Sequence, residues 1–220
     1  MQVWLEIMMK RLLVSVFTCV AFAAFTLAQT NAPTNEQIRD AEIARIKAYC
    51  QELDGYAKRN PMLHRVFGDV SSGMKGDKSR WREFKPKSER DDDYIGSLMG
   101  NADVWSKEGA GILVYCYFQS PSGDWAHQIS YYFREDGSLA RIHAELGTFI
   151  GNMTVIRERF YDSQGKLLRS SQQFLDLKTK KKKKPGEDGE EFFDHPIPMY
   201  RTVKALPFYT LLSKPATKTK

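Results

Sequence analysis

The chain has 220 residues and carries 33 Lys and Arg against 27 Asp and Glu, for a net charge of +6 at pH 7. This length suits a single domain with a sizeable core. Six of the lysines fall within residues 178–184, so the charge excess is local, and a broad basic face of the kind that binds nucleic acid is not indicated.

The beginning of the chain has the pattern of an export signal. An apolar stretch, residues 12–27, follows Lys10 and Arg11 and precedes Ala28. A basic start, an apolar run and small residues at the cut are typical of a cleavable secretory signal, which here spans residues 1–28. A membrane-spanning helix needs about 20 strongly apolar residues, and this run is shorter and contains hydroxyl groups.

We therefore expect a secreted or periplasmic protein with a mature start near Gln29 and no stable membrane anchor after cleavage. Met8 and Met9 are alternative initiators to Met1, because Glu6 is unusual in a basic leader. The mature chain, residues 29–220, is then expected to form one domain.

A helix is predicted over residues 35–58. Thr34 and Gln37 form a capping-box pattern at its start, and the Asn60-Pro61 pair ends it. Apolar residues recur along it at spacings of three and four, with charged residues between them. The apolar stripe consists of Ile43, Ile46, Cys50, Leu53 and Ala57.

From residue 103 the apolar period changes to two, which predicts strands. The predicted strands are 103–106, 112–119, 125–133, 139–146, 153–161 and 166–175, with a further short strand at 81–84. Segment 112–119 is apolar on both sides, as in a central strand covered twice. The expected fold class is α+β, with an N-terminal helix packed on a twisted antiparallel β-meander of about six or seven strands.

Two of the predicted hairpins share a pattern at an offset of 28 residues. Segments 132–141 and 160–169 both follow aromatic-aromatic-x-x-x-Gly-x-Leu-x-Arg. The pattern resembles the Tyr-Asp-x-x-Gly-x-Leu hairpin repeat of several exported bacterial proteins, including YD-repeat proteins, over about 40 residues. This resemblance implies successive hairpins of one meander and carries no chemistry, and two copies are fewer than a repeat array needs.

The part of the chain after the last predicted strand is expected to be mostly irregular. Residues 179–191 are a block of lysines followed by acidic residues, which predicts a mobile charged loop. Segment 192–200 is predicted to be extended because of its prolines, segment 206–212 to be a short docking helix, and 213–220 to be a disordered tail.

The mature chain contains two cysteines. Cys50 lies on the apolar stripe of the predicted helix, and Cys116 lies on the most apolar predicted strand. In an oxidising compartment such a pair is a disulfide candidate, worth roughly 4 kcal/mol in the chain-entropy model. The alternative is two buried thiols too far apart to join, and the sequence leaves both open.

Arg141, His143 and Glu145 form the densest group of chemically versatile side chains, and a period of two places them on one sheet face. A two-residue turn at Asp136-Gly137 sets Ser130 opposite His143. The same register sets Gln128 opposite Glu145, and it sets Ile129, Tyr131 and Phe133 opposite Ala144, Ile142 and Ala140. The group is either a polar groove with His143 as acid-base group or, by the favoured interpretation, the wet face of a half-exposed strand.

Arg157 and Arg159 form a second candidate site. Charge on both faces of this strand is unusual, since Glu158 lies between the two arginines. The pair could hold an anionic ligand, but such a strand is more often an edge strand on which charge blocks unwanted pairing.

Motifs of the known catalytic kinds are absent from the sequence, and the histidines lack metal-ligand spacing, so we expect no cofactor and no metal. The favoured function is a non-catalytic exported binding or envelope-associated module with an apolar or anionic ligand. The alternative is a hydrolase-like enzyme that uses His143 with Glu145 and nearby arginines. A weak contact with an anionic surface is also expected, through Lys180, Lys181, Lys182, Lys183 and Lys184.

Overall fold

The computed structural model describes residues 33–71, 78–84, 96–185 and 194–214. The predicted signal, residues 1–28, lies outside the described residues, as do 186–191 of the charged loop and 215–220 of the tail. The chain divides into two compact units, residues 1–40 and 41–220.

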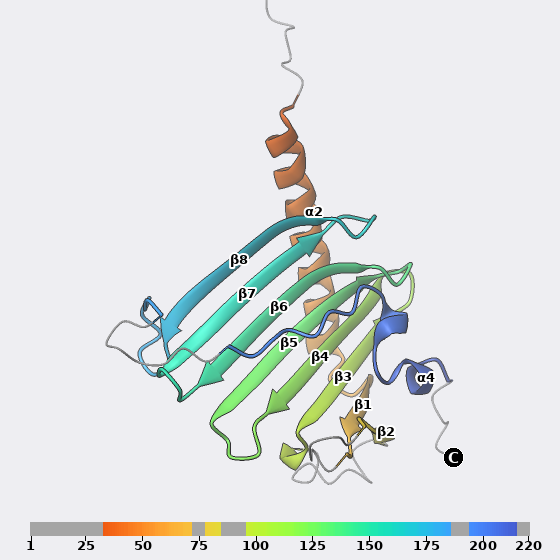
Figure 1. Ribbon diagram of the computed structural model, residues 1–220. Coiled ribbons are helices and arrows are strands. Elements are labelled where there is room, and N and C mark those ends of the chain that lie inside the picture. The colour runs from red at the N-terminus through yellow and green to blue at the C-terminus, as the bar shows by residue number, and fades with distance from the viewer. Residues whose placement is uncertain (1–32, 72–77, 85–95, 186–193, 215–220) are drawn as a thin grey trace, which may run out of the picture. The chain divides into compact units, whose positions relative to one another are not determined.

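The second unit is built on one open sheet of eight antiparallel strands in the order β2-β1-β3-β4-β5-β6-β7-β8 (Figure 1). The predicted α+β class is confirmed, with more strands than expected. The strands are β1 (His64–Asp69), β2 (Trp81–Phe84), β3 (Gly100–Lys107), β4 (Gly111–Gln119), β5 (Trp125–Arg134), β6 (Leu139–Thr148), β7 (Met153–Tyr161) and β8 (Leu167–Asp176).

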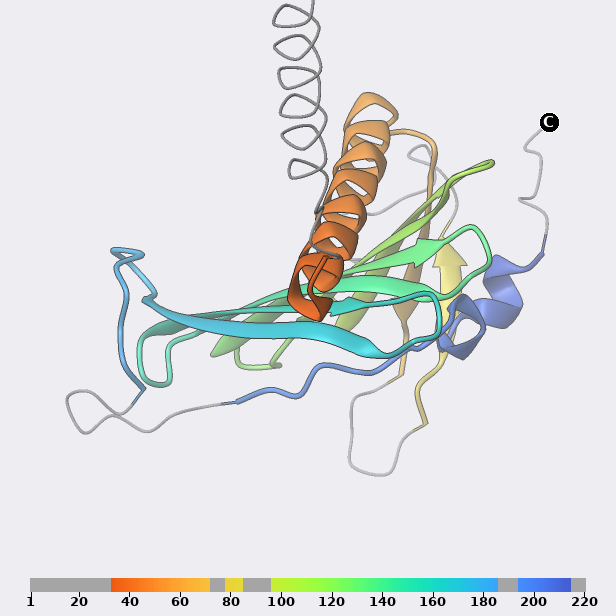
Figure 2. The same ribbon diagram turned by 90° about the horizontal axis from the view of Figure 1, so that it is seen from above.

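The sheet buries apolar side chains on both faces, because successive side chains of a strand alternate between them. The helix face packs against the helix α2 (Asn35–Arg59), and the C-terminal face packs against residues 194–212, here called the C-terminal segment. Figures 1 and 2 show the helix and this segment on opposite sides of the sheet. The helix face presents Leu113, Tyr132, Ala140 and Phe160 to α2. The C-terminal face carries Val114, Cys116, Ile129, Tyr131, Phe133, Ile142 and Ala144.

The helix has the predicted bounds within one residue and the predicted cap. The Thr34 N–H donates to Gln37 Oε1 at 2.8 Å, and the Gln37 N–H donates to Thr34 Oγ1 at 3.2 Å, which is a capping box. Ile43, Ile46, Cys50 and Leu53 are buried against the sheet.

Hydrogen bonds fix where α2 crosses the sheet. Tyr49 donates from its hydroxyl to the Phe133 carbonyl at 2.6 Å, and Tyr132 donates to Asp54 Oδ1 at 2.9 Å. A Cβ on residue 111 would lie 2.0 Å from the Tyr49 hydroxyl. The φ of Gly111, +150°, also favours glycine at this position. Gly111 therefore permits the close approach of helix and sheet.

The C-terminal segment is mostly extended, as predicted for 194–200. Tyr131 donates to the Pro198 carbonyl at 2.9 Å, and Ser138 forms an isolated antiparallel bridge with Thr202. The expected helix at 206–212 is shorter than predicted, since only α4 (Tyr209–Leu212) is helical within it, and a 3-10 turn, η2 (Val203–Ala205), precedes it. Its buried residues include Val203, Leu206 and Phe208.

The two similar hairpins fold alike. Gly137 and Gly165 adopt φ of 80° and 78°, and each ends a three-residue turn, whereas a two-residue turn was predicted at Asp136-Gly137. In both hairpins a β-bulge follows and shifts the register by one, with Ala140 and Leu168 as the extra residues. The bulge restores the predicted pairing beyond it.

As a result, Ser130 pairs with His143 and Gln128 pairs with Glu145, as predicted. The predicted partner of Phe133 is wrong, since Phe133 pairs with Leu139 rather than Ala140. The bulge turns Ala140 toward α2.

Strand β1 was not predicted. Its sequence, His64-Arg65-Val66-Phe67-Gly68-Asp69, contains one short apolar pair and a glycine, which is a weak strand signal. Gly68 leaves room for two neighbouring side chains, since a Cβ there would lie 2.4 Å from Leu98 Cδ1 and 2.7 Å from Phe84 Cε2. The predicted strand at 81–84 is confirmed as β2.

Both cysteines of the second unit are free and buried. Cys50 packs on the helix face and Cys116 on the C-terminal face, so the sheet itself separates the two thiols. Burial raises the pKa of Cys50 to about 12 and also raises the pKa of Cys116. The disulfide alternative is therefore wrong, because a bond needs both side chains on the same side of the sheet.

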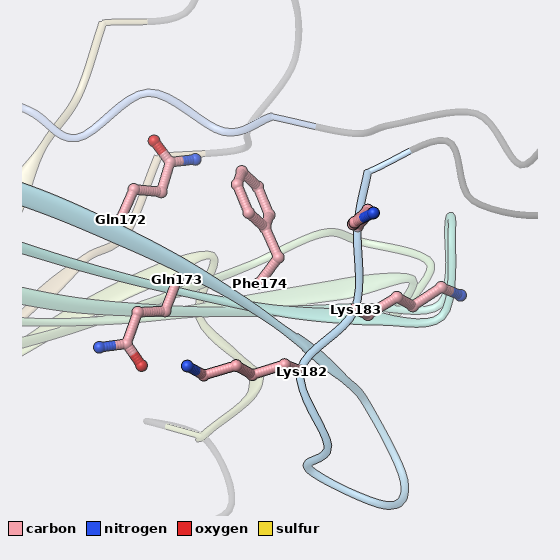
Figure 3. Close-up of a pocket in the computed structure, with 6 residues that line it drawn as sticks. Gln172, Gln173, Phe174, Lys182 and Lys183 are labelled. Carbon is pink, nitrogen blue, oxygen red and sulfur yellow. The ribbon is translucent and has the colours of Figure 1, made fainter.

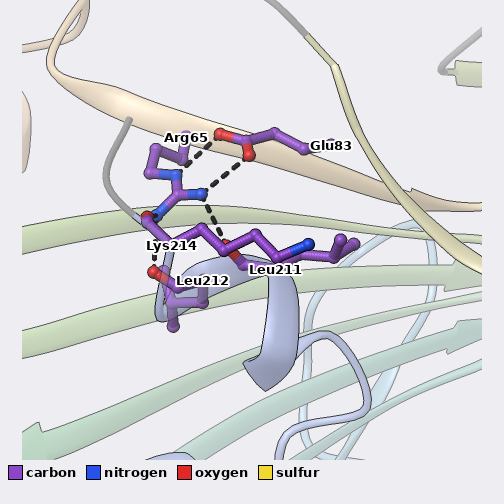
Figure 4. Close-up of polar contacts among 5 residues, drawn as sticks. All are labelled: Arg65, Glu83, Leu211, Leu212 and Lys214. Atoms are coloured by element: carbon purple, nitrogen blue, oxygen red, sulfur yellow. Dashed lines mark hydrogen bonds and ion pairs between the residues drawn. The ribbon is translucent and has the colours of Figure 1, made fainter. Parts of the chain in front are cut away.

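Arg65 ties the end of the C-terminal segment to β1 and β2 (Figure 4). Its guanidinium makes two hydrogen bonds of 2.7 Å to the Glu83 carboxylate. It also donates to the carbonyls of Leu211 at 2.9 Å, Leu212 at 2.6 Å and Lys214 at 3.1 Å. These carbonyls lie at the end of α4, so Arg65 satisfies groups that a helix end leaves without an intrahelical partner.

Replacing Arg65 is expected to loosen this end of the C-terminal segment. We predict that Arg65→Ala lowers the free energy of unfolding by about 2 kcal/mol, because Glu83 and several carbonyls lose a charged donor. Urea denaturation followed by tryptophan fluorescence measures this change. Arg45→Ala is the control, since Arg45 forms only an exposed ion pair with Glu42 and should cost about 0.3 kcal/mol. Equal losses in the two variants would contradict the role of Arg65.

Candidate functional site

The predicted group on β6 lies on the helix face. Arg141 forms an ion pair with Glu158 of β7, and its guanidinium lies 5.3 Å from the Tyr132 ring and 5.5 Å from the Phe160 ring. His143 Nδ1 lies 3.3 Å from Glu158 Oε1. Glu158, which was not singled out as a partner from the sequence, is therefore the centre of this group.

The electrostatics of the group follow from these contacts. The hydrogen bond from His143, together with the Arg141 guanidinium, lowers the pKa of Glu158 to about 2 against the opposing effect of burial. An ionised Glu158 can orient the imidazole of His143, as a carboxylate does for many acid-base histidines. Glu145 points elsewhere, with its Oε1 3.8 Å from Lys180 Nζ.

Arg157 and Arg159 lie on the C-terminal face, away from His143. Arg157 is nearly buried, forms an ion pair with Asp194 and donates to the His195 carbonyl at 3.1 Å. Arg159 contacts Met199 Sδ at 3.3 Å. The predicted residues thus divide into two groups, and the structure does not bring the arginines to His143.

The favoured interpretation of this strand as an edge is wrong. Strand β7 is interior, since it pairs with β6 on one side and β8 on the other. Its charges are accommodated because Glu158 has partners on β6, while Arg157 is covered by the C-terminal segment. The sequence pattern shows that β7 carries charge on both faces, but it does not show which segments pack over those charges.

A histidine pair, which the sequence did not indicate, lies beside Arg157 and joins a buried ring to a half-buried one. His127 of β5 is fully buried, and its Nδ1 lies 3.1 Å from Nδ1 of His195. The His195 ring also packs against Trp125, with 4.2 Å between ring centroids. The pair joins residues 68 positions apart, so only the docking of the C-terminal segment reveals it.

Burial and the nearby cations favour neutral imidazoles in this pair. Desolvation, His195 and Arg157 lower the pKa of His127 to about 4, and burial also lowers the pKa of His195. A hydrogen bond between two neutral rings requires that one Nδ1 carry the proton and the other accept it. Among the described residues, His127 Nε2 has no hydrogen-bond partner, so we assign the proton to His127 Nδ1, where it is used.

The lysine run is partly ordered. The Asp176 N–H donates to the Lys181 carbonyl at 2.8 Å, and the Lys183 N–H donates to the Phe174 carbonyl at 3.0 Å. Residues 181–183 thus fold back along the outer edge of β8, with Lys182 opposite Leu175. The expectation of a mobile loop over 179–191 does not describe this part, because 181–183 have defined partners.

This return of the chain forms a pocket of about 430 Å³ at the edge of β8 (Figure 3). Its lining is three lysines, two glutamines and one aromatic ring: Lys182, Lys183, Lys184, Gln172, Gln173 and Phe174. Gln172 and Phe174 point to one side of β8, whereas Gln173 points to the other with Lys182 (Figure 3). The pocket therefore combines cations and amide donors with one apolar wall.

Two further properties concern only the described part of the chain. Within it, no group of three or more His, Cys, Asp or Glu side chains is arranged to hold a metal ion. None of the described helices combines the length and the apolar character needed to cross a membrane.

Comparisons with family models, with curated proteins and with solved structures found no match for this chain.

The histidine pair should make stability depend on pH. Below pH 6.5 the unfolded chain protonates His127, whereas the folded chain does so only near pH 4. The unfolded state then binds more protons, so the free energy of unfolding falls as the pH falls from 6.5 to about 4, by about 3 kcal/mol in total from this residue. Urea denaturation at several pH values measures the slope.

His127→Phe should reduce the dependence of the free energy of unfolding on pH, because phenylalanine keeps an aromatic ring at this position but has no nitrogen that titrates. Ser171→Ala, an exposed change on β8, is the control and should keep the wild-type slope. A wild-type slope in His127→Phe would show that His127 does not titrate as its burial requires.

Proposed function

We propose that this protein is an exported, non-catalytic binding module that holds an anionic ligand in the lysine-lined pocket at the edge of β8. The observation that carries the proposal is the folding of residues 181–183 onto β8, which gathers Lys182, Lys183 and Lys184 around one hollow. Without this folding, the lysine run would present separate charges and would not form a pocket.

The lining matches carboxylate or phosphate groups. Lysine ammonium groups attract such anions as point charges, and the amides of Gln172 and Gln173 add neutral donors. Lys182 and Lys184 are exposed, so their attraction is weakened by salt, and binding should be moderate and salt-sensitive. Phe174 supports a ligand that also has an apolar part.

The predicted export signal agrees with this function. The pattern of residues 1–28 predicts that the mature chain acts outside the cytoplasm, as an exported binding module does. The pocket lies on the outer edge of the sheet, so a ligand reaches it without any rearrangement of α2 or the C-terminal segment.

Removing two pocket cations should weaken anion binding. We predict that the double variant Lys182→Gln with Lys184→Gln binds pyrophosphate or citrate about tenfold more weakly. Each exposed cation contributes up to about 1 kcal/mol to the binding free energy. Isothermal titration calorimetry at low salt measures this affinity.

The matched control is Lys58→Gln with Lys204→Gln, which removes the same charge from exposed sites away from the pocket. It should bind both anions as the wild type does. Equal loss in the two double variants would show that only net charge matters, and absence of binding to the wild-type protein would end the proposal.

A further inference from the structure

The outer edge of β8 has backbone groups that pair with no described residue, and they lie next to the lysine-lined pocket. β8 is the last strand of the sheet, and residues 181–183 pair only with its final part. The outward carbonyl of Phe174 and the outward N–H of Asp176 are used there. Because backbone groups alternate sides along a strand, the N–H and C=O groups of Ser170 and Gln172 also point outward.

The chain stops pairing at this point for a chemical reason. If the pairing of 181–183 continued, residue 185 would donate its N–H to the Gln172 carbonyl, but residue 185 is a proline and has no N–H. Among the described residues, no backbone group bonds to the outer side of Ser170 or Gln172. Residues 170–173 are exposed on both faces as well.

We propose that this edge accepts an extended acidic peptide segment of a partner protein as an added antiparallel strand, with an acidic side chain near the N-terminal end of that segment in the pocket. The inference rests on the proposed anion-binding function and names the class of its ligand. The edge demonstrably accepts a strand, because residues 181–183 already occupy its far part. Addition of a strand to a sheet edge is a common mode of peptide recognition.

Charge decides which strand fits. A peptide lying along Ser170 and Gln172 points one end at the pocket, where Lys182 and Lys184 provide cations. An acidic segment is therefore attracted. A second copy of this chain, which carries the same lysines and a net charge of +6, is repelled.

The edge can be blocked without removing the pocket. Proline at an outward position of an edge strand deletes only the outward N–H and leaves the pairing with the inner neighbour intact. Gln172→Pro therefore removes one hydrogen bond to an added strand, and its ring obstructs close approach. Gln172→Ala is the matched control, since it loses the same side chain and keeps the backbone N–H.

The test uses the full chain and a labelled peptide of alternating Thr and Val that starts with two Asp behind an acetylated N-terminus, because a strand antiparallel to β8 has its N-terminal end at the pocket. Fluorescence anisotropy gives its affinity, and hydrogen exchange reports protection at Ser170 and Gln172. We expect Gln172→Pro to bind the peptide at least about tenfold more weakly than Gln172→Ala. Both variants lose the Gln172 amide from the pocket lining, so they should bind pyrophosphate equally to each other, and a peptide starting with two Asn should bind weakly to both.

The failures of the two proposals are distinguishable. Equal peptide affinity in Gln172→Pro and Gln172→Ala, with pyrophosphate binding retained, would overturn the added strand and leave the pocket standing. If the wild-type protein binds neither the peptide nor pyrophosphate, the proposed pocket is overturned as well. A dimer that Gln172→Pro dissociates, without peptide binding, would assign the edge to a second copy and overturn the inference.

Discussion

A sheet with apolar side chains on both faces is stable in water only if both faces are covered, and the arrangement of this protein follows from that requirement. The helix α2 covers the end of one face where Leu113, Tyr132 and Phe160 lie. The opposite face is covered by the C-terminal segment, which is mostly extended and contributes Val203, Leu206 and Phe208. Because strands β4 to β6 are buried between these two covers, their alternating pattern decides that Arg141 and His143 lie on the helix face and His127 on the C-terminal face.

The sequence predicted what depends on local periodicity and turn chemistry. The capping box, the helix bounds, the pairing of Ser130 with His143 and the glycine turns all follow from short patterns. Predictions from the sequence failed where contacts between distant segments decide the structure. These contacts are the packing of Gly68 in β1 near Leu98, the ion pair of Arg157 with Asp194, and the pair of His127 with His195. The disulfide failed for the same reason, since burial of two thiols does not show that they share a face.

The charged side chains differ in how many partners the fold gives them. Glu158 is held by Arg141 and His143, and Arg157 is held by the C-terminal segment, so these groups stabilise the structure between strands and between layers. The lysines after β8 differ, because the chain returns along the edge and stops pairing at Pro185. This places Lys182 and Lys184 beside a pocket and leaves Ser170 and Gln172 without backbone partners among the described residues, which is why the proposed functions are placed there.

The docking of the C-terminal segment is the most direct test of this account. Ser138 and Thr202 form a bridge that brings their side chains together, so the double variant Ser138→Cys with Thr202→Cys should form an intramolecular disulfide under mild oxidation. The matched pair, Ser130→Cys with Thr202→Cys, places its thiols on opposite faces and should remain reduced. Mass spectrometry of alkylated, unreduced protein distinguishes the two. No bond in the first variant, or equal bonding in both, would contradict the two-sided covering of the sheet.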